Sequence, residues 1–126
     1  MTSLKVLLAT LILGSSAALA NDCVQPASPE LPDGATSSME DMLAGQQSVK
    51  TFQEENLVYR ECLEQRFTAA KAAIESGEAK SKADKEAAQA EYSEAVDAFN
   101  TAVSTEEEVA GQFNTEIREY KAANPQ

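Results

Sequence analysis

The chain contains no proline between Pro32 and Pro125, and this long stretch limits most strongly the folds open to it. Proline breaks helices and is excluded from the interior of sheets, so a proline-free region of this length can hold long, continuous helices. Apolar residues recur through it at spacings of three and four, which is the period of one helix face. Gly77, a typical helix stop signal, divides the region in two. The pattern therefore predicts an all-α fold built from two long helices.

The first predicted helix covers residues 38–76. Ser37 followed by Glu40 matches a capping box, so the helix should begin near Ser38. Asn56 interrupts the apolar face of this helix, as single polar residues do at helix seams. The apolar face consists of Met39, Met42, Leu43, Val49, Phe52, Tyr59, Leu63, Phe67, Ala70 and Ile74.

The second predicted helix covers residues 82–123 and follows a turn at residues 77–81. Ser81 followed by Asp84 is a weaker capping pattern at its start. Glu106 falls on the apolar face of this helix and interrupts it with a charged side chain. The face otherwise consists of Ala88, Tyr92, Ala95, Phe99, Val103, Val109, Phe113, Ile117 and Tyr120.

Because the two helices have nearly equal length and a short turn joins them, they should lie antiparallel in a coiled-coil-like hairpin over residues 38–124. The facing residue numbers then add up to about 158, which places Tyr59 opposite Phe99. The predicted packing seam consists of Phe52, Tyr59, Leu63, Tyr92, Phe99 and Phe113. A lone two-helix hairpin buries little apolar surface, so either an arm adds a third layer or two hairpins form a four-helix bundle.

Residues 1–20 have the pattern of a secretory signal peptide. Lys5 supplies the positive charge, residues 6–13 are apolar, and the segment ends in Ala-Leu-Ala, a small-x-small cleavage site. We expect cleavage between Ala20 and Asn21 and a periplasmic location. The apolar run is too short to span a membrane, and no second run follows it.

Two cysteines follow the predicted cleavage site, Cys23 and Cys62, and an oxidising compartment favours one disulfide between them. Two polar residues precede Cys23 where a lipoprotein signal has small ones, so we do not expect lipidation. The cysteines are too far apart for a Cys-x-x-Cys redox motif, and a structural role is favoured over a redox role. The bond should tie an arm to the middle of the first helix and bring Val24 or Leu31 near Val58.

Residues 21–37 form this predicted arm, which is extended. Prolines recur at every third position from Pro26 to Pro32, the period of a polyproline II helix, and so line one face. That face could enter a proline-binding groove of another protein or pack on its own chain; we favour the second because the disulfide can hold the arm. Asp33-Gly34 is a turn signal that lets the chain reverse.

The processed chain would be strongly acidic. All 21 acidic residues follow the signal segment and one of the 10 basic residues lies inside it, which leaves 9 basic residues and a net charge of −12. Such a charge repels nucleic acid and anionic membrane surfaces. It permits a cationic partner without requiring one, and solubility is the favoured interpretation.

The sequence lacks the residue patterns of common enzymes. It has no histidine and no tryptophan, and it contains no glycine-rich phosphate loop, nucleophile elbow or metal-spaced cysteine set. We therefore expect no enzyme, no cofactor and no built metal site. The carboxylates at residues 106–108 are typical of a solvated helix face, with a loose divalent-cation site as the alternative.

The start of the predicted mature chain reads Cys-Val-Gln-Pro-Ala-Ser-Pro-Glu-Leu-Pro-Asp-Gly over residues 23–34, and a long helix with one more cysteine follows. This arrangement resembles small uncharacterised exported (periplasmic) helical proteins of Gram-negative bacteria. The resemblance covers the arm and the first helix, and it implies export and a Cys-Pro arm. It carries over no catalytic residue.

These observations favour a non-enzymatic interaction or structural protein of the cell envelope, with a protein partner or self-association. The alternative is a chaperone-like or inhibitory binding module that holds a cationic or unfolded client against its acidic rod.

Overall fold

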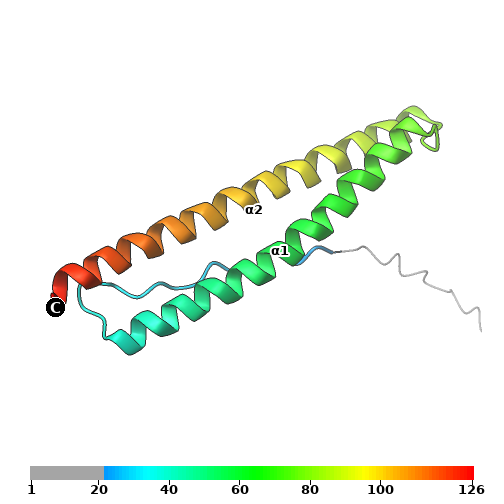
Figure 1. Cartoon of the computed structure of the whole chain (residues 1–126). Helices are drawn as coiled ribbons and strands as arrows, with labels where there is room; N and C mark the ends of the chain where they lie inside the picture. The colour runs from blue at the N-terminus through cyan, green and yellow to red at the C-terminus, as the bar shows by residue number, and fades with distance from the viewer. Residues whose placement is uncertain (1–21) are drawn as a thin grey trace, which may run out of the picture.

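The computed structural model describes residues 22–126, so the predicted signal peptide and its cleavage site at Ala20 and Asn21 lie outside the described part. Two helices form that part, α1 at Met39–Glu75 and α2 at Lys82–Ala123, and it contains no strand. The helices run antiparallel along a rod (Figure 1). The predicted all-α hairpin is thus confirmed. We call the end with the helix–helix turn the tip, and the other end the base.

Each helix begins with a capping box, in which a serine and an acidic residue three positions later bond each other's backbone. At α2 the pair is Ser81 and Asp84, as predicted. At α1 it is Ser38 and Asp41, with the Asp41 N–H donating to Ser38 Oγ over 3.1 Å and the Ser38 N–H donating to Asp41 Oδ2 over 3.1 Å. The predicted Ser37 box was therefore wrong by one residue.

The α1 box also affects the titration of its carboxylate. The Ser38 hydroxyl and then the Ser38 backbone N–H donate to Asp41, and these hydrogen bonds lower the pKa of that carboxyl below its ordinary value. A carboxyl whose pKa is lower in the folded state stabilises that state above its unfolded pKa. This stabilisation is lost as the pH falls through the lowered pKa.

Helix α1 ends one residue before the predicted limit, at Glu75, with Ser76 as its C-cap. Gly77 follows with φ at 74°, a left-handed conformation that residues with a Cβ rarely adopt. Ala79 is buried in the turn that follows, and its N–H donates to the Ala73 carbonyl over 3.4 Å. Gly77 thus stops the helix as predicted, and the turn leads directly into α2.

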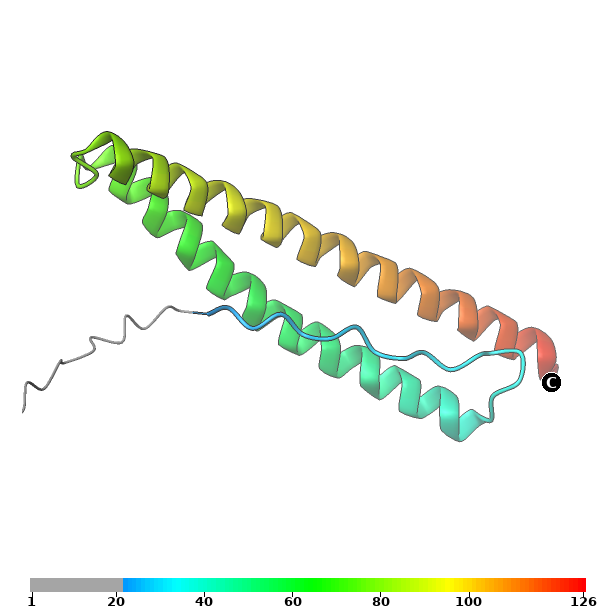
Figure 2. The same ribbon diagram turned by 180° about the vertical axis from the view of Figure 1, so that it is seen from behind.

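The arm lies along the hairpin as a third layer. Cys23 forms the predicted disulfide with Cys62, which places the start of the arm at the middle of α1. From there the arm crosses α1 and runs between the two helices toward the base (Figure 2). Cys23, Pro26, Pro29 and Pro32 are half-buried at every third position, the period of a polyproline II helix. The proline face therefore packs on its own chain.

The arm, whose Val24 or Leu31 was expected near Val58, does not bury Val58. Val24 is 80% exposed and Val58 is 65% exposed. Leu31 packs instead on the buried cluster near the base. For Leu31 the reason is reach, because eight extended residues after Cys23 cover about 25 Å, whereas Val58 lies only ~6 Å along α1 from Cys62.

Two apolar clusters fill the space between the helices and the arm. The arm contributes to both, since Leu31 packs on the cluster near the base and Cys23 packs on the cluster near the middle of the rod. The base cluster consists of Met42, Val49, Phe52, Val109 and Phe113. The middle cluster consists of Tyr59, Leu63 and Ala102.

The arm ends in a tight turn against α2. The Asp33 carboxylate accepts the Ala35 N–H over 2.9 Å, and the Asp33 carbonyl accepts the Ser37 N–H over 2.8 Å. The Gly34 N–H donates to the Glu116 carboxylate over 2.8 Å, so the turn is bonded directly to α2. A Cβ at Gly34 would lie 1.8 Å from the Glu116 carbonyl oxygen, which leaves room for glycine alone.

Alanine at two glycines should therefore shift stability in opposite directions. We expect Gly34→Ala to lower the free energy of unfolding by about 1–3 kcal/mol, because the added methyl pushes the turn off α2. We expect Gly111→Ala to raise it by about 0.5–1 kcal/mol, because that exposed helical site has nothing within 4 Å of an added Cβ. Urea denaturation followed by circular dichroism measures both. Equal stability of Gly34→Ala and wild type would contradict the close contact with α2.

Candidate interaction surface

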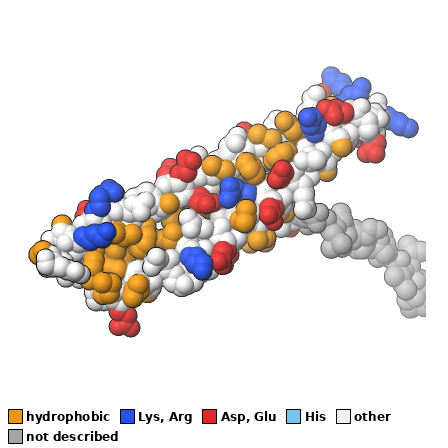
Figure 3. Space-filling view, viewed as in Figure 1, with side chains coloured by type: hydrophobic (Ala, Val, Ile, Leu, Met, Phe, Trp, Pro, Cys, Tyr) orange, Lys and Arg blue, Asp and Glu red, His pale blue; other side chains and the backbone are white. Residues whose placement is uncertain are grey.

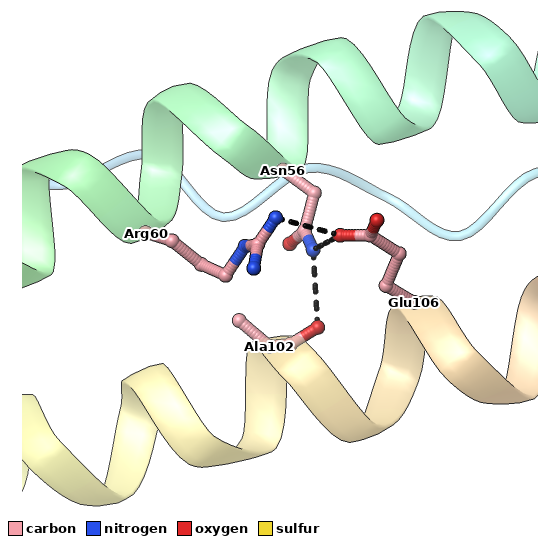
Figure 4. Close-up of polar contacts among 4 residues, drawn as sticks. All are labelled: Asn56, Arg60, Ala102 and Glu106. Carbon is pink, nitrogen blue, oxygen red and sulfur yellow. Dashed lines mark hydrogen bonds and ion pairs between the residues drawn. The ribbon is translucent and has the colours of Figure 1, made fainter.

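The two polar residues that interrupt the apolar faces meet each other inside the hairpin (Figure 4). The Asn56 side chain is only 2% exposed, and its amide donates to the Ala102 carbonyl over 3.0 Å and to Glu106 Oε2 over 2.8 Å. Arg60 completes the cluster with an ion pair to Glu106 at 3.1 Å, while its Nε is buried without a hydrogen-bond partner. A paired polar cluster in an apolar seam favours one register, because sliding the helices would separate its members.

The carboxylates at residues 106–108 do not converge. Glu106 accepts a hydrogen bond from Asn56 and forms an ion pair with Arg60, whereas residues 107 and 108 are exposed. In the part of the chain that the structure describes, Asp33, Glu116 and Glu119 do converge, with carboxylate oxygens within 4.8 Å of one another. Two of these three carboxylates accept backbone N–H groups of the arm turn, so the cluster helps to hold the arm at the base.

The predicted seam residues occupy two different environments. Phe52, Tyr59, Leu63 and Phe113 are buried. Phe99 is half-buried and Tyr92 is 37% exposed.

Phe67 links these two aromatic rings toward the tip. Its ring packs edge-on against Tyr92 with centroids 6.2 Å apart and against Phe99 with centroids 5.8 Å apart. Beside them, Arg66 pairs with Glu91 at 2.6 Å, and the Arg66 Nε also donates to that carboxylate over 2.7 Å. The helix pairing thus continues toward the tip beyond the start of the arm at Cys23.

The base carries an apolar hollow between α1 and α2 that the arm does not cover. Figure 3 shows hydrophobic side chains gathered at this end of the rod, on the side away from the viewer of Figure 2. Met39 and Leu43 are 55% and 57% exposed there. The hollow has a volume of about 510 Å³ and is lined by Met39, Met42, Leu43, Gln46, Phe113, Ile117, Tyr120, Lys121, Asn124 and Gln126.

A second hollow continues the first toward the tip. The two share Leu43, Gln46, Phe113 and Ile117, so they form one surface, which we call the base groove. The second hollow has a volume of about 560 Å³ and is lined by Leu43, Gln46, Gln47, Val49, Lys50, Gln53, Phe113, Asn114 and Ile117. Arm residues line neither hollow.

The charges at the base are divided between its two sides. Of the side chains in residues 22–126, those of Lys50 and Lys121 are the only charged ones that line the base groove, although the chain has 21 acidic and 10 basic residues. The carboxylates of Asp33, Glu116 and Glu119 gather at the arm turn instead. The base groove is therefore mainly apolar at the end of the rod and mixed apolar and amide nearer the tip, with two lysines in its lining, on a chain whose formal net charge is −11.

Sequence reasoning placed Met39, Met42 and Leu43 on one apolar face but did not find the groove. The signal that could have helped is the spacing of Leu43 and Lys50, because residues seven apart lie on one side of a helix. Spacing alone does not say which side of the hairpin the arm covers, and this decides what stays exposed.

Neither helix in residues 22–126 contains an apolar stretch long enough to cross a membrane. Comparison of the chain with protein-family models, with curated proteins and with solved structures finds no match. The base groove is therefore the feature of the described residues that bears most on function.

Proposed function

We propose that this protein is a non-enzymatic interaction or structural protein of the cell envelope, which acts through its helical hairpin. The base groove is the observation that carries the proposal. Large apolar side chains that stay exposed side by side mark sites of protein interaction more often than isolated ones do. Met39 and Leu43 meet that description on α1, and half-buried Ile117 and Tyr120 face them from α2.

The construction of the hairpin supports a binding role. The disulfide and the arm turn attach the third layer at its two ends, so the arm is held on one side of the helices. A held arm leaves the base groove open on the other side. The disulfide also fits an oxidising compartment, which supports the proposed export to the periplasm.

A photo-crosslinking amino acid at Leu43 tests this function in growing cells. We expect it to form an adduct with an envelope protein, because the side chain is 57% exposed in the groove. The same amino acid at Val58, which is 65% exposed but outside the groove, is the matched control and should give none. Absence of any adduct at Leu43, or equal adducts at both positions, would contradict the proposal.

The alternative is a chaperone-like or inhibitory binding module for a cationic or unfolded client, and its cationic form finds support on the other side of the base. Asp33, Glu116 and Glu119 there form a concentrated negative charge. Binding at that side would weaken strongly with salt, because exposed charges are screened over about 10 Å at 0.1 M ionic strength. Client binding that is unaffected by salt would argue against this alternative.

A further inference from the structure

We propose that the base groove binds an amphipathic helix of a partner protein, with carboxylates on both flanks of the apolar face of that helix. The inference rests on the proposed function and specifies the partner. It runs against the overall charge of the chain, which on its own would favour a cationic partner.

The shape of the base groove fits a helix. On α1 it extends from Met39 to Gln53, or about 21 Å at the rise of an α-helix, which is the length of a partner helix of roughly 14 residues. Its lining includes Met42, Leu43 and Ile117, side chains that can pack against the apolar face of a third helix. The methionines also help, because their flexible side chains adapt to the shape of a bound partner.

The lysines specify the charge of that helix. Lys121 comes from α2 and lines the hollow at the base, whereas Lys50 comes from α1 and lines the hollow nearer the tip. The two cations therefore lie on opposite sides of the groove and toward opposite ends. A helix with carboxylates on both flanks can meet both cations, whereas a single anionic head group can meet only one.

The same charges disfavour a second copy of the chain as the occupant. If two base grooves faced each other, the contact would bring the Lys50 and Lys121 side chains of both copies together, and no Asp or Glu side chain lines either hollow in residues 22–126. Like charges in an interface reduce affinity. Two copies of a chain with a formal net charge of −11 would also repel each other.

Three labelled 15-residue helical peptides test the proposal against the disulfide-bonded protein by fluorescence anisotropy. The first has leucines at helical spacing with glutamates on both flanks, the second has lysines in place of the glutamates, and the third has serines in place of the leucines. We expect the glutamate peptide to bind at least tenfold more tightly than either of the others. Its affinity should fall with rising salt, because its flank charges remain partly exposed.

Variants of the protein locate the binding. Lys50→Gln and Lys121→Gln should each weaken the glutamate peptide about threefold, and the double variant roughly tenfold, as expected for partly exposed ion pairs. Leu43→Gln should weaken it more than tenfold. Lys80→Gln, at an exposed lysine in the tip turn, is the control and should leave the affinity unchanged. Circular dichroism verifies that each variant is folded.

Several outcomes would overturn the inference. Equal or tighter binding of the lysine peptide would do so, as would an unchanged affinity in the double lysine variant. Binding of palmitate without binding of the glutamate peptide would assign the groove to a lipid, and a dimer that dissociates in the Leu43→Gln variant would assign it to a second copy. The proposed function fails separately, because it depends on the adduct at Leu43 in cells and not on the peptide charge.

Discussion

Replacing both Cys23 and Cys62 by serine is expected to lower the free energy of unfolding by about 4 kcal/mol. The bond joins residues 39 apart in the sequence, so its loss gives the unfolded chain much more freedom. The start of the arm should then separate from α1 more readily, because the disulfide is its covalent link to that helix. The contacts between α1 and α2 do not involve the disulfide, so most of the helix content should remain.

Urea denaturation and far-ultraviolet circular dichroism of the double variant measure both effects. The wild-type protein in reductant is the matched control and should lose a similar amount of stability. Loss of the helical signal in the variant would show that the hairpin depends on the pinned arm. A change of less than about 1 kcal/mol would show that the arm remains ordered without the bond.

Leu63→Ala is expected to have the next largest effect, a loss of about 3 kcal/mol within the usual range for a buried leucine. Leu63 is 1% exposed in the middle cluster, where it packs with Tyr59 and Ala102, and Ala98, Phe99 and Cys23 surround the cluster. The substitution removes apolar contacts and leaves a cavity that rigid helices cannot fill by collapsing.

Leu57→Ala is the matched control, since Leu57 lies on the same helix but is 49% exposed. It should change the free energy of unfolding by less than 1 kcal/mol, because little of its surface leaves water on folding. Thermal or urea denaturation of the two variants measures the difference. Equal losses would mean that the middle cluster is not packed as the structure shows.

Much of the local structure could be predicted from the sequence because its causes are local. The extent of both helices follows from the apolar period, the absence of proline and the glycine at the tip. The one error of register concerns the first cap, where two adjacent serines each precede an acidic residue by three positions. Which serine caps α1 depends on the turn that precedes the helix. The Ser37 N–H donates to the Asp33 carbonyl, so Ser37 still belongs to that turn and Ser38 becomes the cap.

The disulfide could be predicted for a different reason. Only two cysteines exist in the chain, so a single pairing was possible once an oxidising compartment was expected. The third-residue period of the prolines also indicated which side of the arm would face the protein, because three residues make one turn of a polyproline II helix.

Only the tertiary structure decided how the polar residues that interrupt the two apolar faces find partners. Asn56 and Glu106 each appear as a fault in one helix, yet they bond each other across 50 positions of sequence. That partnership depends on the axial offset and the rotation of α1 against α2. Neither is determined by the spacing of residues within one helix.

The base groove is the other feature that depended on tertiary structure. Helix period places Leu43 and Lys50 on one side of α1, and composition makes the whole chain acidic. Which side the arm covers depends on long-range contacts, such as the bond from Gly34 to Glu116. Those contacts hold the arm against one side of the hairpin and leave a partly apolar groove with two lysines open on the other. The sequence alone thus determined the two helices, the turn between them and the disulfide, whereas packing between distant segments determined the surface that remains free to bind.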